Sequence, residues 1–222
     1  MTVARKWNDD FQPPFPLTRR ARQWPILLFA LLLAGCAAAG PSADDLRAIR
    51  SIRITPALNP VNFGVTIGGM PAPDEGRELT RALASQNLRL GDELTQEASG
   101  QLRRNGFEVT NSIAPSIPSD ATLRLSITQS TYVMGLLRKV GPHLVVVATL
   151  TDRSGQKLFY RIYRYDMHNF DLGPTLGLTP SDRYSFDSLD DAISHPEIAA
   201  AGLAAAIPMI TSDLGRTLRK RR

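Results

Sequence analysis

Two β-rich runs separated by a short polar turn constrain the fold more than any other feature of this sequence. Residues 144–150 are apolar almost throughout, and residues 157–165 are rich in aromatic and branched side chains. Both compositions are typical of strands, and the Asp-Arg-Ser-Gly sequence at 152–155 is typical of a turn. Because strands joined by so short a connection pair antiparallel, we predict a β-hairpin, with its first strand in the centre of a sheet.

Three further segments are predicted to be strands. They cover residues 51–54, 107–110 and 121–128. In the third, Leu123 and Leu125 alternate with polar residues, which is typical of a strand with one buried and one solvated face.

Two amphipathic helices are predicted. Leu94, Ala98 and Leu102 repeat every four residues, and Asn105-Gly106 then provides a left-handed stop. Residues 196–220 form a second, longer pattern that Pro208 should kink or interrupt. Its predicted buried stripe consists of Leu203, Ile207, Ile210, Leu214 and Leu218.

The remaining segments are predicted to be less regular. Residues 56–76 and 166–187 contain Gly and Pro and are expected to be long loops, with a short helix at 78–85. The order of elements predicts an α+β fold: a single domain over 48–222, with a mostly antiparallel sheet and helices packed on one face. A composition of 43% hydrophobic and 21% charged residues fits a globular domain.

The N-terminal part of the chain has the organisation of an export signal. A basic segment at 18–22 precedes an apolar run of 11 residues at 24–34. As a helix this run would be about 16 Å long at 1.5 Å per residue. A membrane-spanning helix must cross a hydrocarbon core of about 30 Å, so the run fits the apolar part of a signal peptide instead. Small residues then lead directly to Cys36, the only cysteine of the chain.

The sequence Leu33-Ala34-Gly35-Cys36 resembles the lipobox of bacterial lipoproteins. The resemblance implies that residues 1–35 are removed as a signal peptide, that Cys36 is acylated, and that residues 36–47 form a lipidated tether. Ala37, rather than Asp, follows the cysteine, which implies sorting to the periplasmic face of the outer membrane. The alternative is an ordinary secretory signal in which the cysteine occurs by chance. The true start codon and the choice between general and twin-arginine export stay open.

The domain itself resembles the small α/β domain of several periplasmic accessory lipoproteins. The similarity rests on a helix end and strand at 102–109, Leu-Arg-Arg-Asn-Gly-Phe-Glu-Val, and on Asp-Ala-Thr-Leu at 120–123. Lipoproteins of this kind take part in curli secretion, activate peptidoglycan synthases or assist transporters. The resemblance covers residues 49–165 and implies a fold more than a function.

The sequence lacks the familiar signatures of catalysis. It has no Gly-x-Ser-x-Gly elbow, no phosphate-binding glycine loop and no zinc-like spacing of its three histidines. We therefore predict a protein that is not an enzyme and has no cofactor or metal. The alternative is a metal-assisted envelope hydrolase that uses Asp166, His168 and Asp171, although a polar loop after a strand explains these residues more simply.

The aromatic strand at 157–165 is the first candidate for a contact surface. Arg161, Tyr163 and Tyr165 share one face, and Tyr160, Ile162 and Arg164 share the other. Tyr and Arg are enriched at protein interfaces, so the first face is predicted to bind a partner. A purely structural strand is the alternative.

The basic C-terminus is the second candidate. It ends in Arg219, Lys220, Arg221 and Arg222, which could contact anionic lipid or cell-wall polymer, although a solvated helix end explains them as well. Five basic and two acidic residues precede Cys36, which leaves only +2 of the formal net charge of +5 for the rest of the chain. This small excess argues against nucleic acid as a partner.

These features lead to one main functional prediction. We expect a lipid-anchored envelope protein that binds another envelope protein as a non-catalytic accessory or scaffold subunit. Direct binding of peptidoglycan or anionic lipid through the C-terminus is the second prediction. Partner identity and oligomeric state do not follow from the sequence.

Overall fold

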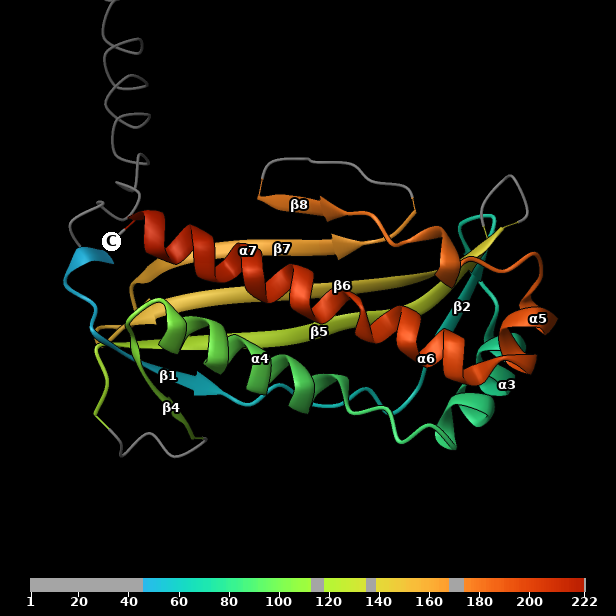
Figure 1. Cartoon of the computed structure of the whole chain (residues 1–222), viewed down its shortest axis with the longest axis horizontal. Coiled ribbons are helices and arrows are strands. Elements are labelled where there is room, and N and C mark those ends of the chain that lie inside the picture. Colours follow the sequence, from blue (N-terminus) through green and yellow to red (C-terminus); the bar gives the residue numbers. More distant parts are fainter. Residues whose placement is uncertain (1–45, 113–117, 135–138, 168–173, 222) are drawn as a thin grey trace, which may run out of the picture. The chain divides into compact units, whose positions relative to one another are not determined.

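The computed structural model describes residues 46–112, 118–134, 139–167 and 174–221 of the chain, with the side chain of Arg221 excepted. These residues form one α+β domain built on a mixed, eight-stranded sheet, which confirms the predicted fold class (Figure 1). The strands are β1 (Ser51–Thr55), β2 (Gly64–Ile67), β3 (Met70–Pro71), β4 (Glu108–Asn111), β5 (Ala121–Met134), β6 (Val140–Asp152), β7 (Lys157–Tyr165) and β8 (Thr175–Leu178). The helices are α3 (Pro73–Ala84), α4 (Leu90–Arg104), α5 (Leu189–Ser194), α6 (Pro196–Ala204) and α7 (Ala206–Arg221), with a 3₁₀ turn at Asp182–Tyr184.

The three long strands β5, β6 and β7 pair antiparallel and form the centre of the sheet. The predicted hairpin is confirmed, since β6 and β7 pair in register from Leu144–Tyr165 to Leu150–Phe159. Asp152 stabilises the turn between them by accepting hydrogen bonds from the backbone N–H groups of Ser154 and Gln156, both at 2.8 Å. β6 lies between two strands, as its apolar sequence predicted.

Strand β5 is long enough to pair with two short parallel strands along the same edge. Its first half pairs with β1 and its second half with β2. A bulge between Ile127 and Gln129 shifts the register with β6. The extra residue exchanges the two faces, so that Leu123 and Leu125 are buried before the bulge and Ser130 and Tyr132 after it. The sheet is therefore partly parallel at its edges, while its centre is antiparallel as predicted.

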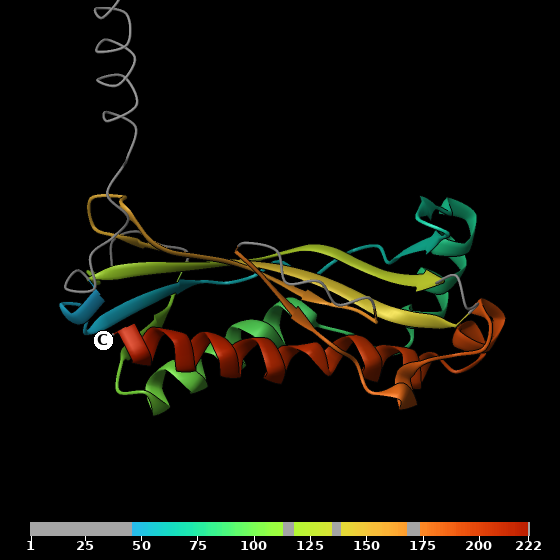
Figure 2. The same ribbon diagram turned by 90° about the horizontal axis from the view of Figure 1, so that it is seen from above.

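Helices α4, α6 and α7 cover one face of the sheet, and no described helix covers the centre of the other face (Figure 2). Helix α4 also packs against α7. The core lies between this helical layer and the sheet, and Leu94, Leu123 and Val146 are fully buried in it. The predicted one-sided arrangement is confirmed.

The C-terminal end of α4 shows how local sequence determines local structure. Gly106 has a φ of 84°, and Phe107 donates its N–H to the carbonyl of Leu102 at 3.1 Å. Gly106 donates to the carbonyl of Arg103 at 2.9 Å. These two bonds form a Schellman motif, which satisfies carbonyls that have no partner within the helix. The buried ring of Phe107 then directs the chain into β4.

The long C-terminal helix is interrupted, as Pro208 predicted. Helix α6 ends at Ala204 and α7 begins at Ala206, which places Pro208 in the first turn of α7, where a missing N–H costs nothing. Together the two helices, Pro196–Lys220, are apolar and long enough to span a membrane by composition and length. All five residues of the predicted stripe are nevertheless buried in the domain core, so this is a core helix.

The predicted loop at 56–76 is wrong in part. Strands β2 and β3 form a two-residue hairpin within it, in which Ile67 pairs with Met70. Gly68 and Gly69 have φ values of 57° and 85°, which is the backbone conformation that a tight hairpin turn needs. Helix α3 already begins at Pro73, five residues before the predicted start, because proline is favoured in the first helical turn.

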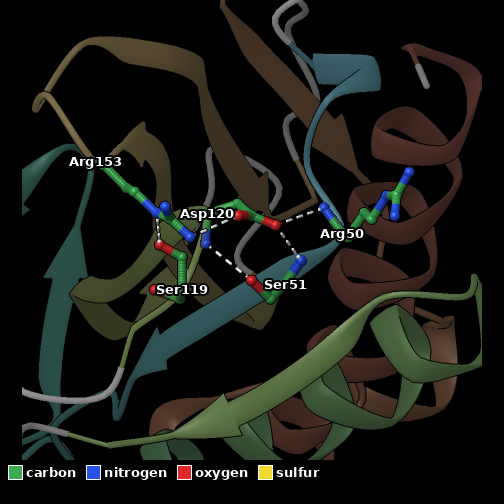
Figure 3. A network of polar contacts seen from close by, with 5 residues as sticks. All are labelled: Arg50, Ser51, Ser119, Asp120 and Arg153. Atoms are coloured by element: carbon green, nitrogen blue, oxygen red, sulfur yellow. Dashed lines mark hydrogen bonds and ion pairs between the residues drawn. The ribbon is translucent and has the colours of Figure 1, made fainter.

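A polar network fixes the start of β1 against the start of β5 (Figure 3). The carboxylate of Asp120 accepts hydrogen bonds from the backbone N–H groups of Arg50 and Ser51, both at 2.9 Å. Its other oxygen lies 2.9 Å from the guanidinium of Arg153. The N–H donors of Ser51 and then Arg50 hold the pKa of Asp120 below its ordinary value of 3.8.

Candidate functional site

Strand β7 contributes to both faces of the sheet, and the structure distinguishes them. Arg161, Tyr163 and Tyr165 point into the helical layer, where Tyr163 and Tyr165 are 0% and 1% exposed. The guanidinium of Arg161 lies 2.6 Å from the Asp213 carboxylate, and the Tyr163 hydroxyl is 3.3 Å from the same carboxylate oxygen. Tyr163 and Tyr165 are therefore buried rather than available as the predicted contact surface, and Arg161 and Tyr163 contact Asp213 of α7.

Burial has the expected effect on these tyrosines. Loss of solvent raises the pKa of Tyr165 to about 12 and raises the pKa of Tyr163 further. Both hydroxyls therefore stay protonated at neutral pH. Their burial favours the structural strand, which is the alternative that the sequence left open.

No helix within the described residues covers the centre of the opposite face of the same strands, and this face is partly exposed. We define the helix-free face by the side chains of β5, β6 and β7 that point away from the helical layer. Its apolar members are Val145, Val147 and Ile162, and its polar or basic members include Arg124, Tyr160 and Arg164. Tyr160 is 40% exposed and lies under the Lys157 ammonium, 5.0 Å from its ring centre.

The charged side chains of the helix-free face are basic, apart from Asp166 beyond the end of β7. Residues 121–134, 140–151 and 157–165 contain no Asp or Glu. Arg124 is exposed and has no ion-pair partner among the residues that the structure describes. Arg164 pairs with Asp166, which follows the end of β7. The face therefore combines aromatic, aliphatic and basic groups, with Asp152 and Asp166 at the ends of its strands.

Asp166 belongs to a buried polar cluster rather than to an open loop. Its carboxylate lies 3.1 Å from Nδ1 of His143, whose Nε2 lies 3.0 Å from the side chain of Gln129. No group of three or more His, Cys, Asp or Glu side chains suited to a metal occurs within the described ranges. His168 and Asp171, the other members of the predicted metal site, lie outside the described residues.

A second surface feature, absent from the sequence predictions, is an open groove beside α3. It has a volume of about 640 Å³ and lies between α3 and the β2–β3 hairpin. Arg77 and Arg81 line it from one face of the helix. Arg77 and Arg81 are four residues apart, so they share a face when both belong to one helix. The helix was predicted to begin at residue 78, which left Arg77 and Pro73 outside it.

The structure describes only some of the residues of the other predicted sites. Arg219 and Lys220 are exposed at the end of α7, where positive charge suits the helix dipole. The side chain of Arg221, all of Arg222 and the lipobox with Cys36 lie outside the described residues. Anchoring and anionic contacts therefore stay predictions.

Comparison with known proteins gives only distant structural similarity. No family model and no curated protein matches the chain. A Xanthomonas campestris protein of the DUF330 family is 15% identical, with a TM-score of 0.43, over 82% of this chain and 88% of that one. A minor lipoprotein from Acinetobacter baumannii is 13% identical, with a TM-score of 0.38, over 77% and 94%. The PelC dodecamer from Paraburkholderia phytofirmans is 12% identical, with a TM-score of 0.30, over 79% and 94%. Similarities at this level assign no function.

Proposed function

We propose that this chain is a lipid-anchored envelope protein whose domain binds another envelope protein as a non-catalytic accessory subunit. In this proposal Cys36 carries the lipid and places the domain at the periplasmic face of the outer membrane. Two or more acyl chains give stable anchoring, because each buried methylene contributes about 0.8 kcal/mol. The domain then acts by binding its partner protein.

The helix-free face is the observation that carries this proposal. Its exposed Tyr160 and Arg124, together with the partly buried Arg164, are residue types that contribute most to binding at protein interfaces. The aliphatic side chains between them are only partly buried, and residues 121–134, 140–151 and 157–165 supply no negative charge. This combination suits a partner that presents an acidic surface with apolar residues at its centre.

A charge-reversal experiment tests the proposal. The tagged, acylated protein is cross-linked in cells, and the captured proteins are compared between the wild type, Arg124→Glu and Arg103→Glu. Arg103 is an exposed arginine on α4, in the helical layer, so the control makes the same charge change on the other side of the sheet. We expect the wild type to capture one dominant envelope protein. Arg103→Glu should still capture it, and Arg124→Glu should not.

Two results would count against the proposal. Equal capture by both variants would remove the helix-free face as the contact surface. Equal capture by an unacylated Cys36→Ser protein would show that anchoring does not contribute. Circular dichroism of the purified variants checks that each one is folded.

A further inference from the structure

The groove beside α3 is lined mainly by apolar residues, and its polar members are Asn62, Arg77, Thr80 and Arg81. Phe63 and Val65 form the floor and are buried, while Pro71, Pro73 and Ala84 line the sides. A volume of about 640 Å³ lies within the range of pockets that hold small-molecule ligands, about 300–1,000 Å³. This volume and the mainly apolar lining suit part of an alkyl chain lying in an open groove.

Both backbone polar groups of Phe63 and the carbonyl of Val65 already have hydrogen-bond partners. The hydroxyl of Thr80 accepts a hydrogen bond from the N–H of Phe63 at 2.9 Å and donates to the Phe63 carbonyl at 3.1 Å. The N–H of Ala72 donates to the carbonyl of Val65 at 2.9 Å. These three groups are therefore not available to pair with an extended peptide, and unpaired buried backbone groups are costly. An alkyl chain has no polar groups and needs no hydrogen-bond partners.

The charged residues that line the groove are both arginines. Arg77 and Arg81 lie on the groove side of α3, whereas Asp74, Glu75 and Glu78 do not line it. Arg77 pairs with Asp74 in an exposed position, and Arg81 has no acidic partner within the described part of the chain. A guanidinium group binds phosphate through parallel hydrogen bonds.

From this arrangement we propose that the groove binds one acyl chain of a monoacyl phospholipid, with its phosphate on Arg77 and Arg81. The apolar floor accepts the chain, and the two arginines select the anionic headgroup. This site is separate from the helix-free face and does not depend on the partner proposed above.

Binding can be measured with full-length protein carrying Cys36→Ser, so that no acyl group of its own is attached. The probes are palmitoyl-lysophosphatidic acid and its zwitterionic counterpart palmitoyl-lysophosphatidylcholine, both below their micelle concentrations. Native mass spectrometry counts the bound lipid, and titration calorimetry gives Kd. We expect one bound lysophosphatidic acid and an affinity at least about tenfold higher than for the zwitterionic lipid, equivalent to about 1.4 kcal/mol.

Three variants locate the site. Arg77→Glu with Arg81→Glu should weaken lysophosphatidic acid at least about tenfold, since it reverses both charges. Ala84→Trp fills the groove from an exposed helix position and should abolish binding of both lipids. Arg103→Glu, on a different helix, should bind as the parent protein does.

The proposal is overturned if the folded parent protein shows no saturable binding. Unchanged binding in Ala84→Trp would place the lipid elsewhere. Displacement of the lipid by a short acidic peptide at comparable concentration would identify the groove as a peptide site instead.

Discussion

Asp213 on α7 lies 2.6 Å from the guanidinium of Arg161 on β7 and joins the C-terminal helix to the sheet. The same carboxylate oxygen is 3.3 Å from the hydroxyls of Tyr163 and Thr217. Three side chains from two elements thus share one acceptor, and this shared contact explains why this side of β7 is internal. Asp213→Ala should lower the free energy of unfolding by about 1–3 kcal/mol, since it leaves a partly buried guanidinium without its counter-charge.

Urea denaturation measures this change. Asp190→Ala provides the control, because Asp190 is exposed in the first turn of α5, and its loss should change stability by no more than about 0.5 kcal/mol. If both variants were equally stable, Arg161 and Tyr163 would not depend on Asp213.

The two faces of β7 show what the sequence could and could not predict. Alternation predicted correctly that Arg161, Tyr163 and Tyr165 share a face, because side chains of a strand point alternately to opposite sides. It could not decide which face was buried, since both carry aromatic and basic residues. That choice depends on contacts with distant elements, such as Asp213 on α7, which is 52 positions from Arg161.

Acid should weaken the attachment of β1 through Asp120. The pKa of this carboxyl is held below 3.8 in the folded chain, so its contribution is fully present above that pH and is lost as pH falls through the lowered value. Asp120→Asn should be about 1–2 kcal/mol less stable than the wild type at pH 7. The difference should shrink towards pH 2, as followed by thermal unfolding across this range. A constant difference at every pH would show that the charge of Asp120 is unimportant.

The N-terminus of α4 should tolerate no side chain at Gly91. A Cβ there would lie 2.5 Å from the carbonyl oxygen of Ala57 and 2.6 Å from the backbone of Leu58. Gly91→Ala should therefore destabilise the domain by about 1–3 kcal/mol. Gly100→Ala in the same helix meets only the flexible Arg104 side chain, at 3.6 Å, and should stabilise by about 0.5–1 kcal/mol. The same sign for both changes in a denaturation experiment would contradict the close packing at Gly91.

Long elements were more predictable than short ones for a physical reason. The hairpin of β6 and β7 and helix α4 contain enough residues for their hydrophobic periodicity to be recognised. Their ends also carry recognisable turn or cap residues. Strands β2 and β3 have four and two residues, too few for a period. The Gly-Pro composition around them indicated a loop, so the groove that they form with α3 was not foreseen.

Replacement of Cys36 should release the protein from the membrane fraction. In Cys36→Ser the thiol that would carry the lipid is absent, and the domain has no other anchor in the proposal. Cell fractionation with labelled palmitate measures both effects. We expect label and membrane association in the wild type and neither in the variant. Membrane association that survives in the variant would indicate a different mode of attachment.

The most direct test of the central claim is site-specific photo-cross-linking in cells. A photoreactive amino acid is placed at Tyr160, on the helix-free face, or at Gln96, which is exposed on α4 in the helical layer. The account predicts a discrete adduct with one envelope protein from position 160 and none from position 96. An adduct only from position 96, or the same adducts from both positions, would contradict a partner-binding role for the helix-free face.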